Sequence, residues 1–235
     1  MSESVYKRVI IKLSGEALAG KNGQGIDQTV LSAVTDQIIA IKNLGIEIGI
    51  IVGGGNFWRG KQGTEMDRST ADHMGMLATV INALAIQDAL ERKGAPVRVQ
   101  TALTITRVAE PYILRKAMSH LKKGRIVIFA CGTGNPYFTT DTAAALRAAE
   151  IGADVLLLAK NVDGIYDSDP KLNSNAKKLA SVTYREYIEK GLKAMDTTAI
   201  TMCMENQIPV LAFGLFEKDA LVRAVRGEKI GTLIN

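Results

Sequence analysis

Cysteine and aromatic residues are scarce in this sequence, and each shortage excludes a class of protein. The two cysteines, Cys131 and Cys203, have no second thiol or histidine at metal-ligand spacing, so we expect both to be small buried hydrophobic residues. Aromatic residues make up 5% of the chain, and the lysines and arginines behind its net charge of +5 are spread along it. Since a nucleic-acid surface usually shows a basic stripe or stacking aromatics, the composition favours small anionic ligands over nucleic acid.

Long apolar runs are also missing. No run reaches 18 apolar residues, and the first residues, MSESVYKR, contain no signal-peptide core. We therefore expect a cytoplasmic protein that has no membrane partner. Hydrophobic residues still make up 47% of the 235 residues, which is enough for a sizeable core in one large domain or two small ones.

Short apolar runs alternate with helical patterns along the chain. We expect strands over residues 5–13, 46–52, 97–103, 125–131, 154–159, 208–213 and 230–234, and helices over residues 27–44, 70–93, 111–122, 142–152, 196–207 and 217–227. This alternation predicts an α/β fold with a mostly parallel sheet and helices on both faces. In the longest helix, the face expected to meet the core carries Met74, Leu77, Ala78, Ile81, Leu84 and Ala85.

Three glycine-containing loops follow expected strands. Thr133 to Asp141 reads TGNPYFTTD and precedes an alanine-rich helix, Lys12 to Gly15 reads KLSG, and Gly53 to Asn56 reads GGGN. The carboxyl ends of parallel strands meet at one edge of a sheet, where backbone N–H groups and helix N-termini hold anions. The three loops therefore predict a single crevice that handles phosphate groups.

Charged residues accompany these loops. A strand-end lysine such as Lys12 can simply snorkel to solvent, but the Ser-Gly turn after it favours an anion site. Arg59 follows the loop from Gly53 to Asn56 and is suited to clamping phosphate oxygens. Asp141 can cap its helix, orient a lysine or metal ion, or do both. Asp72, expected in the first turn of its helix, is explained by the helix dipole alone.

Two other patterns have ordinary explanations. GEALAGK, residues 15–21, matches the spacing of a P-loop, but Asn22 stands where a Ser or Thr should reach magnesium, so we reject that interpretation. Residues 20–25 then form a flexible loop. Residues 160–170 contain an Asp-Gly turn and on their own predict an exposed β-hairpin.

Taken together, the motifs resemble the amino acid kinase family and, within it, the bacterial UMP kinases. The matching pieces, in family order, are KLSGEAL (12–18), IVGGGNFWRG (51–60), DHMGMLAT (72–79), GTGNPYFTTD (132–141), VDGIYDSDP (162–170) and GEKIGT (227–232). KLSG and GGG are shared across the superfamily, whereas DHMGMLAT with TGNPYFTTD is more specific. The resemblance implies a three-layer αβα sandwich forming one domain over residues 1–235. Its acceptor half would span about 1–152 and its ATP-binding half about 153–235.

The resemblance also implies an activity and its residues. The γ-phosphoryl group of ATP, bound with Mg²⁺, would pass to UMP in pyrimidine nucleotide synthesis, and the chain itself would supply no metal ligand. The catalytic residues would be Lys12, Arg59 and Asp141, with Asp141 positioning Lys12. ATP would be bound by Lys12, Leu13, Ser14, Gly15, Gly55, Arg59, Lys160, Asn161, Tyr166 and Asp169. UMP would be bound by Gly54, Asp72, Thr133, Gly134, Asn135, Pro136, Tyr137, Phe138, Thr139 and Thr140.

Regulation and assembly follow from the same resemblance. GTP would activate through the segment Gly20, Lys21, Asn22, Gly23, Gln24 and Gly25, UTP would inhibit, and the chain would form a homohexamer.

Two alternatives stay open at this point. Another kinase of this fold, acting on a carboxylate or carbamate, would share the ATP end and differ at Asp72 and residues 133–140. A non-catalytic nucleotide-binding protein would keep the fold without turnover. The joint presence of Lys12, Arg59 and Asp141 favours a catalyst.

Overall fold

The computed structural model describes residues 4–58, 65–168, 172–173 and 175–235. The strands are β1 (Arg8–Leu13), β2 (Glu47–Val52), β3 (Val97–Thr101), β4 (Glu110–Pro111), β5 (Ile126–Ala130), β6 (Val155–Lys160), β7 (Ser181–Val182), β8 (Val210–Gly214) and β9 (Thr232–Ile234). The helices are α1 (Gly15–Leu18), α2 (Gln28–Lys42), α3 (Arg68–Arg92), α4 (Leu114–Lys122), α5 (Thr140–Ile151), α6 (Tyr184–Glu189), α7 (Thr197–Glu205) and α8 (Ala220–Val225), with a short 3₁₀ turn, η1 (Gly20–Asn22).

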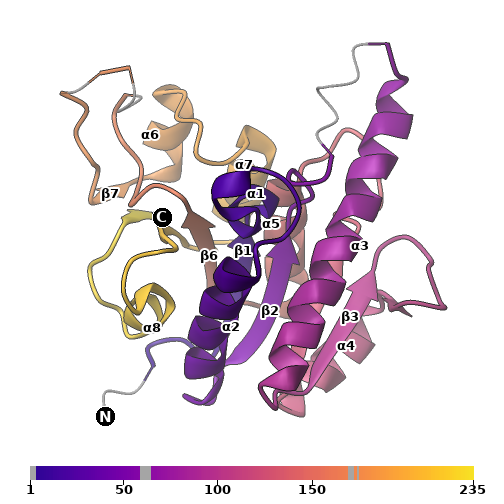
Figure 1. The fold of residues 1–235 in the computed structure, drawn as a ribbon. Coiled ribbons are helices and arrows are strands. Elements are labelled where there is room, and N and C mark those ends of the chain that lie inside the picture. The colour runs from indigo at the N-terminus through magenta and orange to yellow at the C-terminus, as the bar shows by residue number, and fades with distance from the viewer. Residues whose placement is uncertain (1–3, 59–64, 169–171, 174) are drawn as a thin grey trace.

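Within the described residues, the strands form one nine-stranded sheet in the order β4-β3-β5-β2-β1-β6-β8-β9-β7 (Figure 1). Neighbouring strands are parallel except for β8 and β9, which run antiparallel. β1 lies at the centre, paired with β2 on one side and β6 on the other. The predicted mostly parallel sheet is confirmed.

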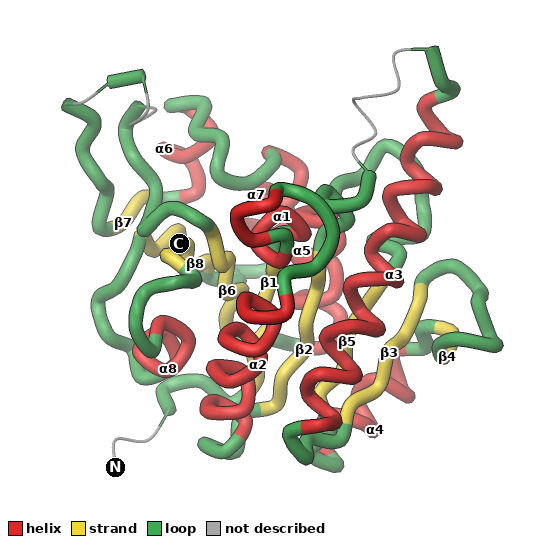
Figure 2. The backbone as a smooth tube through the Cα atoms, viewed as in Figure 1, coloured by secondary structure: helices red, strands yellow, loops and turns green. Residues whose placement is uncertain are grey.

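Helices cover both faces of the sheet (Figure 2). Alternate residues of β1 face opposite sides: Val9, Ile11 and Leu13 pack in one core with α2, α3 and α8, whereas Ile10 packs in another with α4, α5 and α7. Because strands buried on both faces need continuous apolar runs, the apolar runs of the sequence fold as this sheet. The predicted three-layer αβα sandwich is confirmed.

Local signals in the sequence account for several helix ends. The Asp27 carboxylate accepts hydrogen bonds from the N–H groups of Thr29 and Val30 at the start of α2. Thr183 and Glu186 form a capping box at the start of α6, in which each side chain accepts a hydrogen bond from the backbone N–H of the other. Gly152 ends α5 with a φ of 63°, a conformation that glycine adopts without steric cost.

The predicted core face of α3 is wrong in part: Ala78 is buried and Leu84 and Ala85 pack against the core as expected, but other members of that face do not. Leu77 and Ile81 are 50% and 48% exposed, and the buried positions of α3 include Met76, Val80 and Ile86 instead. This helix carries apolar residues on two sides, so periodicity alone did not identify the one that meets the sheet. An apolar stripe of α3 consequently faces solvent.

Other element limits also differ from the predictions. Pro111 was expected to begin a helix but lies in the edge strand β4, where proline is tolerated because one side of the strand is unpaired, and α4 begins at Leu114. β1 begins at Arg8, since Val5 is 60% exposed. Residues 165–167 do not return along β6 as a hairpin, because Tyr166 bridges to Lys178 instead.

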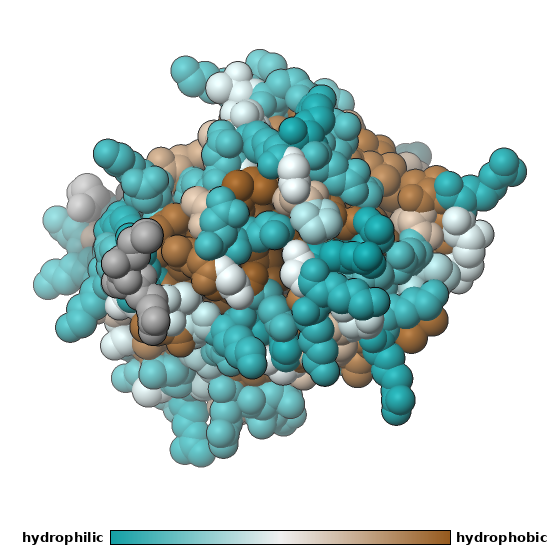
Figure 3. All heavy atoms as spheres, turned by 90° about the horizontal axis from the view of Figure 1, so that it is seen from below, coloured by the Kyte–Doolittle hydropathy of each residue, from teal (hydrophilic) through white to brown (hydrophobic). Residues whose placement is uncertain are grey.

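The two ends of the sheet differ in character. The strands β1, β2 and β6 end at the top of Figure 1, where the glycine-containing loops lie. Figure 3 shows the opposite end, with polar side chains over much of the face and apolar atoms between them. Across the residues that the structure describes, no helix is both long and apolar enough to cross a bilayer.

Candidate active site

Lys12 and Asp141 form an ion pair at the end of the central strand, with 2.5 Å between Lys12 Nζ and Asp141 Oδ1. Lys12 is only 8% exposed, and its side chain lies on the α5 side of the sheet because it alternates with Leu13. Asp141 is in the first turn of α5. A buried lysine requires a partner for its charge, and this carboxylate supplies one. The structure thus brings together two of the three predicted catalytic residues.

The N-terminus of α5 is fixed by Thr139, which was predicted for the site, and by Thr142 and Asp196, which were not. Thr139, not Asp141, is the N-cap, and its hydroxyl oxygen accepts hydrogen bonds from the N–H groups of Asp141 and Thr142. The Thr139 hydroxyl in turn donates to Asp196, as does the Thr142 hydroxyl, at 3.1 Å. Asp196 also caps α7 by accepting the Ala199 N–H at 2.9 Å. The only sequence signal for Asp196 was that it begins a helix.

The glycine loop from Gly53 to Asn56 packs tightly between α1 and α3. A Cβ atom on Gly15 would lie 2.6 Å from the Gly53 carbonyl oxygen, and one on Gly54 would lie 2.7 Å from the Gly75 carbonyl oxygen. Side chains at these positions would force the loop away from its neighbours. The Glu16 side chain lies next to Gly55, since a Cβ atom on Gly55 would be 3.2 Å from the Glu16 carboxylate.

A pocket of about 170 Å³ opens beside this loop. Of the residues predicted to bind UMP, seven line it: Gly54, Asp72, Thr133, Asn135, Phe138, Thr139 and Thr140. Gly134, Pro136 and Tyr137 do not line it. The pocket also has walls that the prediction missed: Trp58, Ala71, Gly75, Met76, Thr79 and Gly132. Most of these lie near DHMGMLAT, the motif that could have indicated them.

Asp72 connects α3 to the loop that closes this pocket. Asp67 is the N-cap of α3, so Asp72 lies one turn further in than predicted. Its Oδ2 accepts the Tyr137 N–H at 2.8 Å and the Arg68 Nε–H at 2.9 Å. Tyr137 has a φ of 72°, which is uncommon for a residue with a side chain, and the Arg68 guanidinium lies 5.5 Å from its ring centre. Asp72 therefore holds the pocket loop in an unusual backbone conformation.

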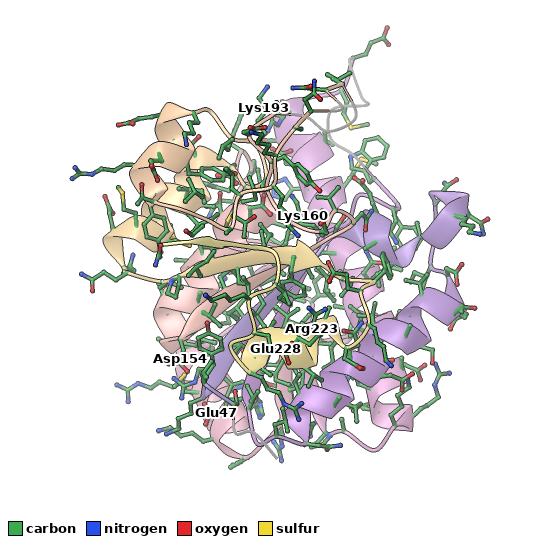
Figure 4. The ribbon with its side chains drawn as sticks, turned by 90° about the vertical axis from the view of Figure 1, so that its left-hand side faces the viewer. Glu47, Asp154, Lys160, Lys193, Arg223 and Glu228 are labelled. Atoms are coloured by element: carbon green, nitrogen blue, oxygen red, sulfur yellow. The ribbon has the colours of Figure 1, made fainter. Side chains whose placement is uncertain are left out.

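A second pocket, of about 520 Å³, lies beyond the end of β6. Lys160 and Tyr166, both predicted to bind ATP, line it together with Lys190, Leu192 and Lys193. Asn161 is exposed and is not among its walls. Figure 4 shows Lys160 and Lys193 toward the same end of the molecule, far from Glu47 and Asp154.

Lys160 has a lowered pKa because of where it lies in the site. Its Nζ donates a hydrogen bond to the Ala194 carbonyl. Burial lowers the pKa of Lys160, and the positive charge of Lys12 lowers it further, while Asp141 and Glu16 partly offset both effects. Lys160 is therefore close to the Lys12–Asp141 pair as well as to the second pocket.

Some predicted positions are not in these pockets. Arg59 and Asp169 lie outside the described residues. The segment Gly20 to Gly25 meets the site through Asn56, whose side-chain N–H donates to the Gly25 carbonyl at 2.6 Å. Among the described residues, no group of three or more histidine, cysteine, aspartate or glutamate side chains is arranged to hold a metal ion.

Known structures share this architecture. The chain is similar to the UMP kinase from Bacillus anthracis, with 41% identity and a TM-score of 0.95 over 98% of this chain and 96% of that one. It is also similar to the UMP kinase from Ureaplasma parvum, with 37% identity and a TM-score of 0.92 over 100% of both chains. For the uridylate kinase from Archaeoglobus fulgidus, the identity is 25% and the TM-score 0.73, over 97% and 99%. The sequence matches the amino acid kinase family over residues 7–213, and the chain therefore belongs to this family.

Proposed function

We propose that the chain is a UMP kinase, which transfers the γ-phosphoryl group of ATP to UMP and forms ADP and UDP. The observation that carries this proposal is the position of the Lys12–Asp141 pair between two pockets. Thr140 lines the smaller pocket and directly precedes Asp141 in the sequence. Lys160 lines the larger pocket and lies close enough to Lys12 for the charge of Lys12 to act on it. The likeness to two UMP kinases over nearly the whole chain supports the same function.

UMP would occupy the smaller pocket. The described residues that line this pocket all lie between Gly54 and Thr140, within the proposed acceptor half, about 1–152. Asp72 would accept a hydrogen bond from the ribose, and the threonines at the start of α5 would place the phosphate at a helix N-terminus, where the dipole favours negative charge.

ATP would occupy the larger pocket and extend its phosphates toward Lys12. The described walls of this pocket lie between Lys160 and Ala194, within the proposed ATP half, about 153–235. Tyr166, whose hydroxyl donates to Asp163 at 2.7 Å, would lie against the nucleoside. The roles of Leu13, Ser14, Gly15, Gly55, Asn161, Arg59 and Asp169 remain predictions.

The proposed reaction needs no general base. A phosphate oxygen of UMP is already anionic near neutral pH, so catalysis consists of aligning donor and acceptor and stabilising charge on the transferred group. Lys12 would supply a positive charge at that point, and Asp141 would hold the ammonium in place. The loop N–H groups of Gly54 and Gly55 would add hydrogen bonds that do not have to reorganise during the reaction.

Mg²⁺ would arrive with ATP. It usually keeps several waters and is held by substrate phosphates with only one or two carboxylates, which fits a site where the described carboxylates that act on Lys160 are Asp141 and Glu16. When bound, Mg²⁺ would supply positive charge to the β- and γ-phosphates.

Regulation, assembly and location complete the proposal. The solvent-facing apolar stripe of α3, with Leu77 and Ile81, supports a homo-oligomer, for which we propose a hexamer. Activation by GTP through residues 20–25 is supported by the contact of Gly25 with Asn56. Inhibition by UTP and a cytoplasmic location rest on the family resemblance and the sequence.

A coupled assay of ADP release tests the function directly. Mg-ATP is offered with UMP, CMP, AMP, dUMP, N-acetylglutamate or carbamate, with and without GTP. We expect turnover with UMP. Activity only with a non-nucleotide acceptor would overturn the assignment of the smaller pocket, and no activity with any acceptor would favour a binding protein.

A further inference from the structure

Two asparagine side chains, Asn56 and Asn82, form a reciprocal pair inside the protein. Asn56 is 2% exposed and Asn82 is fully buried. The Asn56 side-chain N–H donates to Asn82 Oδ1 at 3.0 Å, and the Asn82 side-chain N–H donates to Asn56 Oδ1 at 2.7 Å. Buried amides are stable only when hydrogen-bonded, and an apolar pair would fill such a space at less cost. The pair therefore calls for an explanation beyond packing.

The pair joins three segments that are distant in sequence. Asn82, on α3, also donates to the Gly53 carbonyl at 2.7 Å. Asn56 donates to the Gly25 carbonyl at 2.6 Å, and its own carbonyl accepts the Gly25 N–H at 3.1 Å. Residues 20–25, the glycine loop and α3 are thus connected through one buried set of hydrogen bonds.

The bond to Gly53 sets the direction of a neighbouring donor. A peptide group is planar, so its C=O and N–H point in opposite directions. With the Gly53 carbonyl held by Asn82, the Gly54 N–H must point away from Asn82. Among the described residues, no acceptor is bound to this N–H, and Gly54 lines the smaller pocket. The donor is therefore held in a fixed direction while remaining available to a ligand.

We propose that Asn82, acting with Asn56, is a positioning residue that orients the Gly53–Gly54 peptide toward the phosphate being transferred. Through Gly25, the same pair makes that orientation depend on residues 20–25. The inference rests on the proposed phosphoryl transfer. Since a displacement of about 1 Å in a positioned group can cost about 10²-fold in rate, loss of the pair should act on turnover more than on substrate affinity.

The test compares Asn82→Asp and Asn82→Leu with a matched control, Thr35→Val. Asn82→Asp keeps the shape but replaces the N–H donor, and Asn82→Leu removes all polar contacts. Thr35 is also fully buried, but its hydroxyl bonds only within α2, to the Leu31 and Ser32 carbonyls. The control therefore removes a buried hydrogen bond without touching the loop. Steady-state kcat and KM for UMP and ATP are measured with thermal unfolding for every variant.

We expect kcat to fall about 10²-fold in both Asn82 variants with little change in either KM, while Thr35→Val keeps the wild-type kcat. Equal kcat in all folded variants, with only the melting temperature lowered, would overturn the proposal. If one Asn82 variant does not fold, the kcat of the other variant tests the proposal.

Hydrogen exchange of the backbone separates this inference from the proposed function. Without any substrate, the Asn82 variants should lose protection in residues 53–56 and at Gly25, and the Thr35 variant should not. If the wild type does not phosphorylate UMP, the proposed function fails, whereas the exchange result still decides whether the pair orders the loop. Unchanged exchange in both segments would overturn the positioning role.

Discussion

Lys12 and Lys160 lie near one another at the ends of two adjacent parallel strands, and burial together with the charge of Lys12 lowers the pKa of Lys160. Burying Lys160 beside a second cation costs stability, because desolvation and the neighbouring positive charge both disfavour its charged form. An incoming triphosphate would remove that cost by supplying negative charge. The site is thus arranged to bind an anionic ligand, and this arrangement lowers the stability of the ligand-free protein.

Replacement of Lys160 should stabilise the empty protein. Its pKa in the fold is lower than the ordinary value of 10.5, so the unfolded chain binds the proton more tightly. The cost is fully present below the folded pKa and disappears as pH rises toward 10.5. We expect Lys160→Met to raise the free energy of unfolding at neutral pH, with a gain that shrinks under alkaline conditions.

Denaturant unfolding across a pH series measures this effect. Lys178→Met is a control of opposite sign, because the hydrogen bond to Asp163 raises the pKa of Lys178. That group contributes stability below its unfolded pKa and loses it as pH rises through the folded pKa. A loss of stability in Lys160→Met at neutral pH would contradict the prediction.

Lys12→Ala should reduce turnover while the chain stays folded. Loss of one preorganised group that stabilises developing charge typically costs about 10²- to 10³-fold in rate. Circular dichroism and the coupled assay measure fold and turnover. Lys93→Ala is a suitable control, because Lys93 also pairs with a carboxylate, Asp36, at 2.6 Å but on the surface. Near-normal turnover of folded Lys12→Ala would remove Lys12 from the mechanism.

Asp72→Asn should weaken UMP more than ATP. The amide keeps an oxygen that can accept the Tyr137 N–H but loses the charge that pairs with Arg68 and would bind the ribose strongly. Calorimetric titration of each nucleotide measures the two affinities. Equal weakening of both would mean that Asp72 only holds the pocket loop.

Asp196→Ala should lower both stability and turnover. It removes the N-cap of α7, worth about 1 kcal/mol, and releases the Thr139 cap that holds the start of α5. Asp27→Ala removes a comparable cap from α2 and serves as the control. If both variants lose the same stability and neither loses kcat, then Asp196 acts only as a helix cap.

Ile81→Lys should dissociate the proposed oligomer. Ile81 lies on the exposed stripe of α3, and a charge there would have to be desolvated in a helix-to-helix interface. Sedimentation velocity measures the assembly, with Phe216→Lys as the control, since Phe216 is equally apolar and 53% exposed but lies between β8 and α8. A wild-type chain that sediments as a monomer would refute the assembly itself.

Much of this architecture could be predicted from the sequence because its signals are local. Buried parallel strands need continuous apolar runs, and the glycines after β1 and β2 mark places where backbones touch. Of the seven residues predicted for UMP that line one pocket, five share the loop from Thr133 to Thr140, while Asp72 comes from the first turns of α3 and Gly54 from the loop after β2.

The remainder depended on contacts that no local pattern encodes. α3 is apolar on two sides, so which side faces the sheet is decided by its neighbours. Asp196 reaches Thr139 across 57 positions of sequence, and Asn82 reaches Gly53 across 29. Such partners emerge only when the sheet order is known.

The central position of β1 in the sheet affects how the chain can fold while the ribosome is still synthesising it. Val9 pairs with Val155, so one edge of the first strand made must wait for β6. Such distant pairing is slow, and the open edge of a mostly apolar strand recruits other strands. A nascent chain halted before β6 should therefore aggregate or occupy a chaperone, and the cation of Lys12 would gain its second neighbour, Lys160, only once β6 has been synthesised.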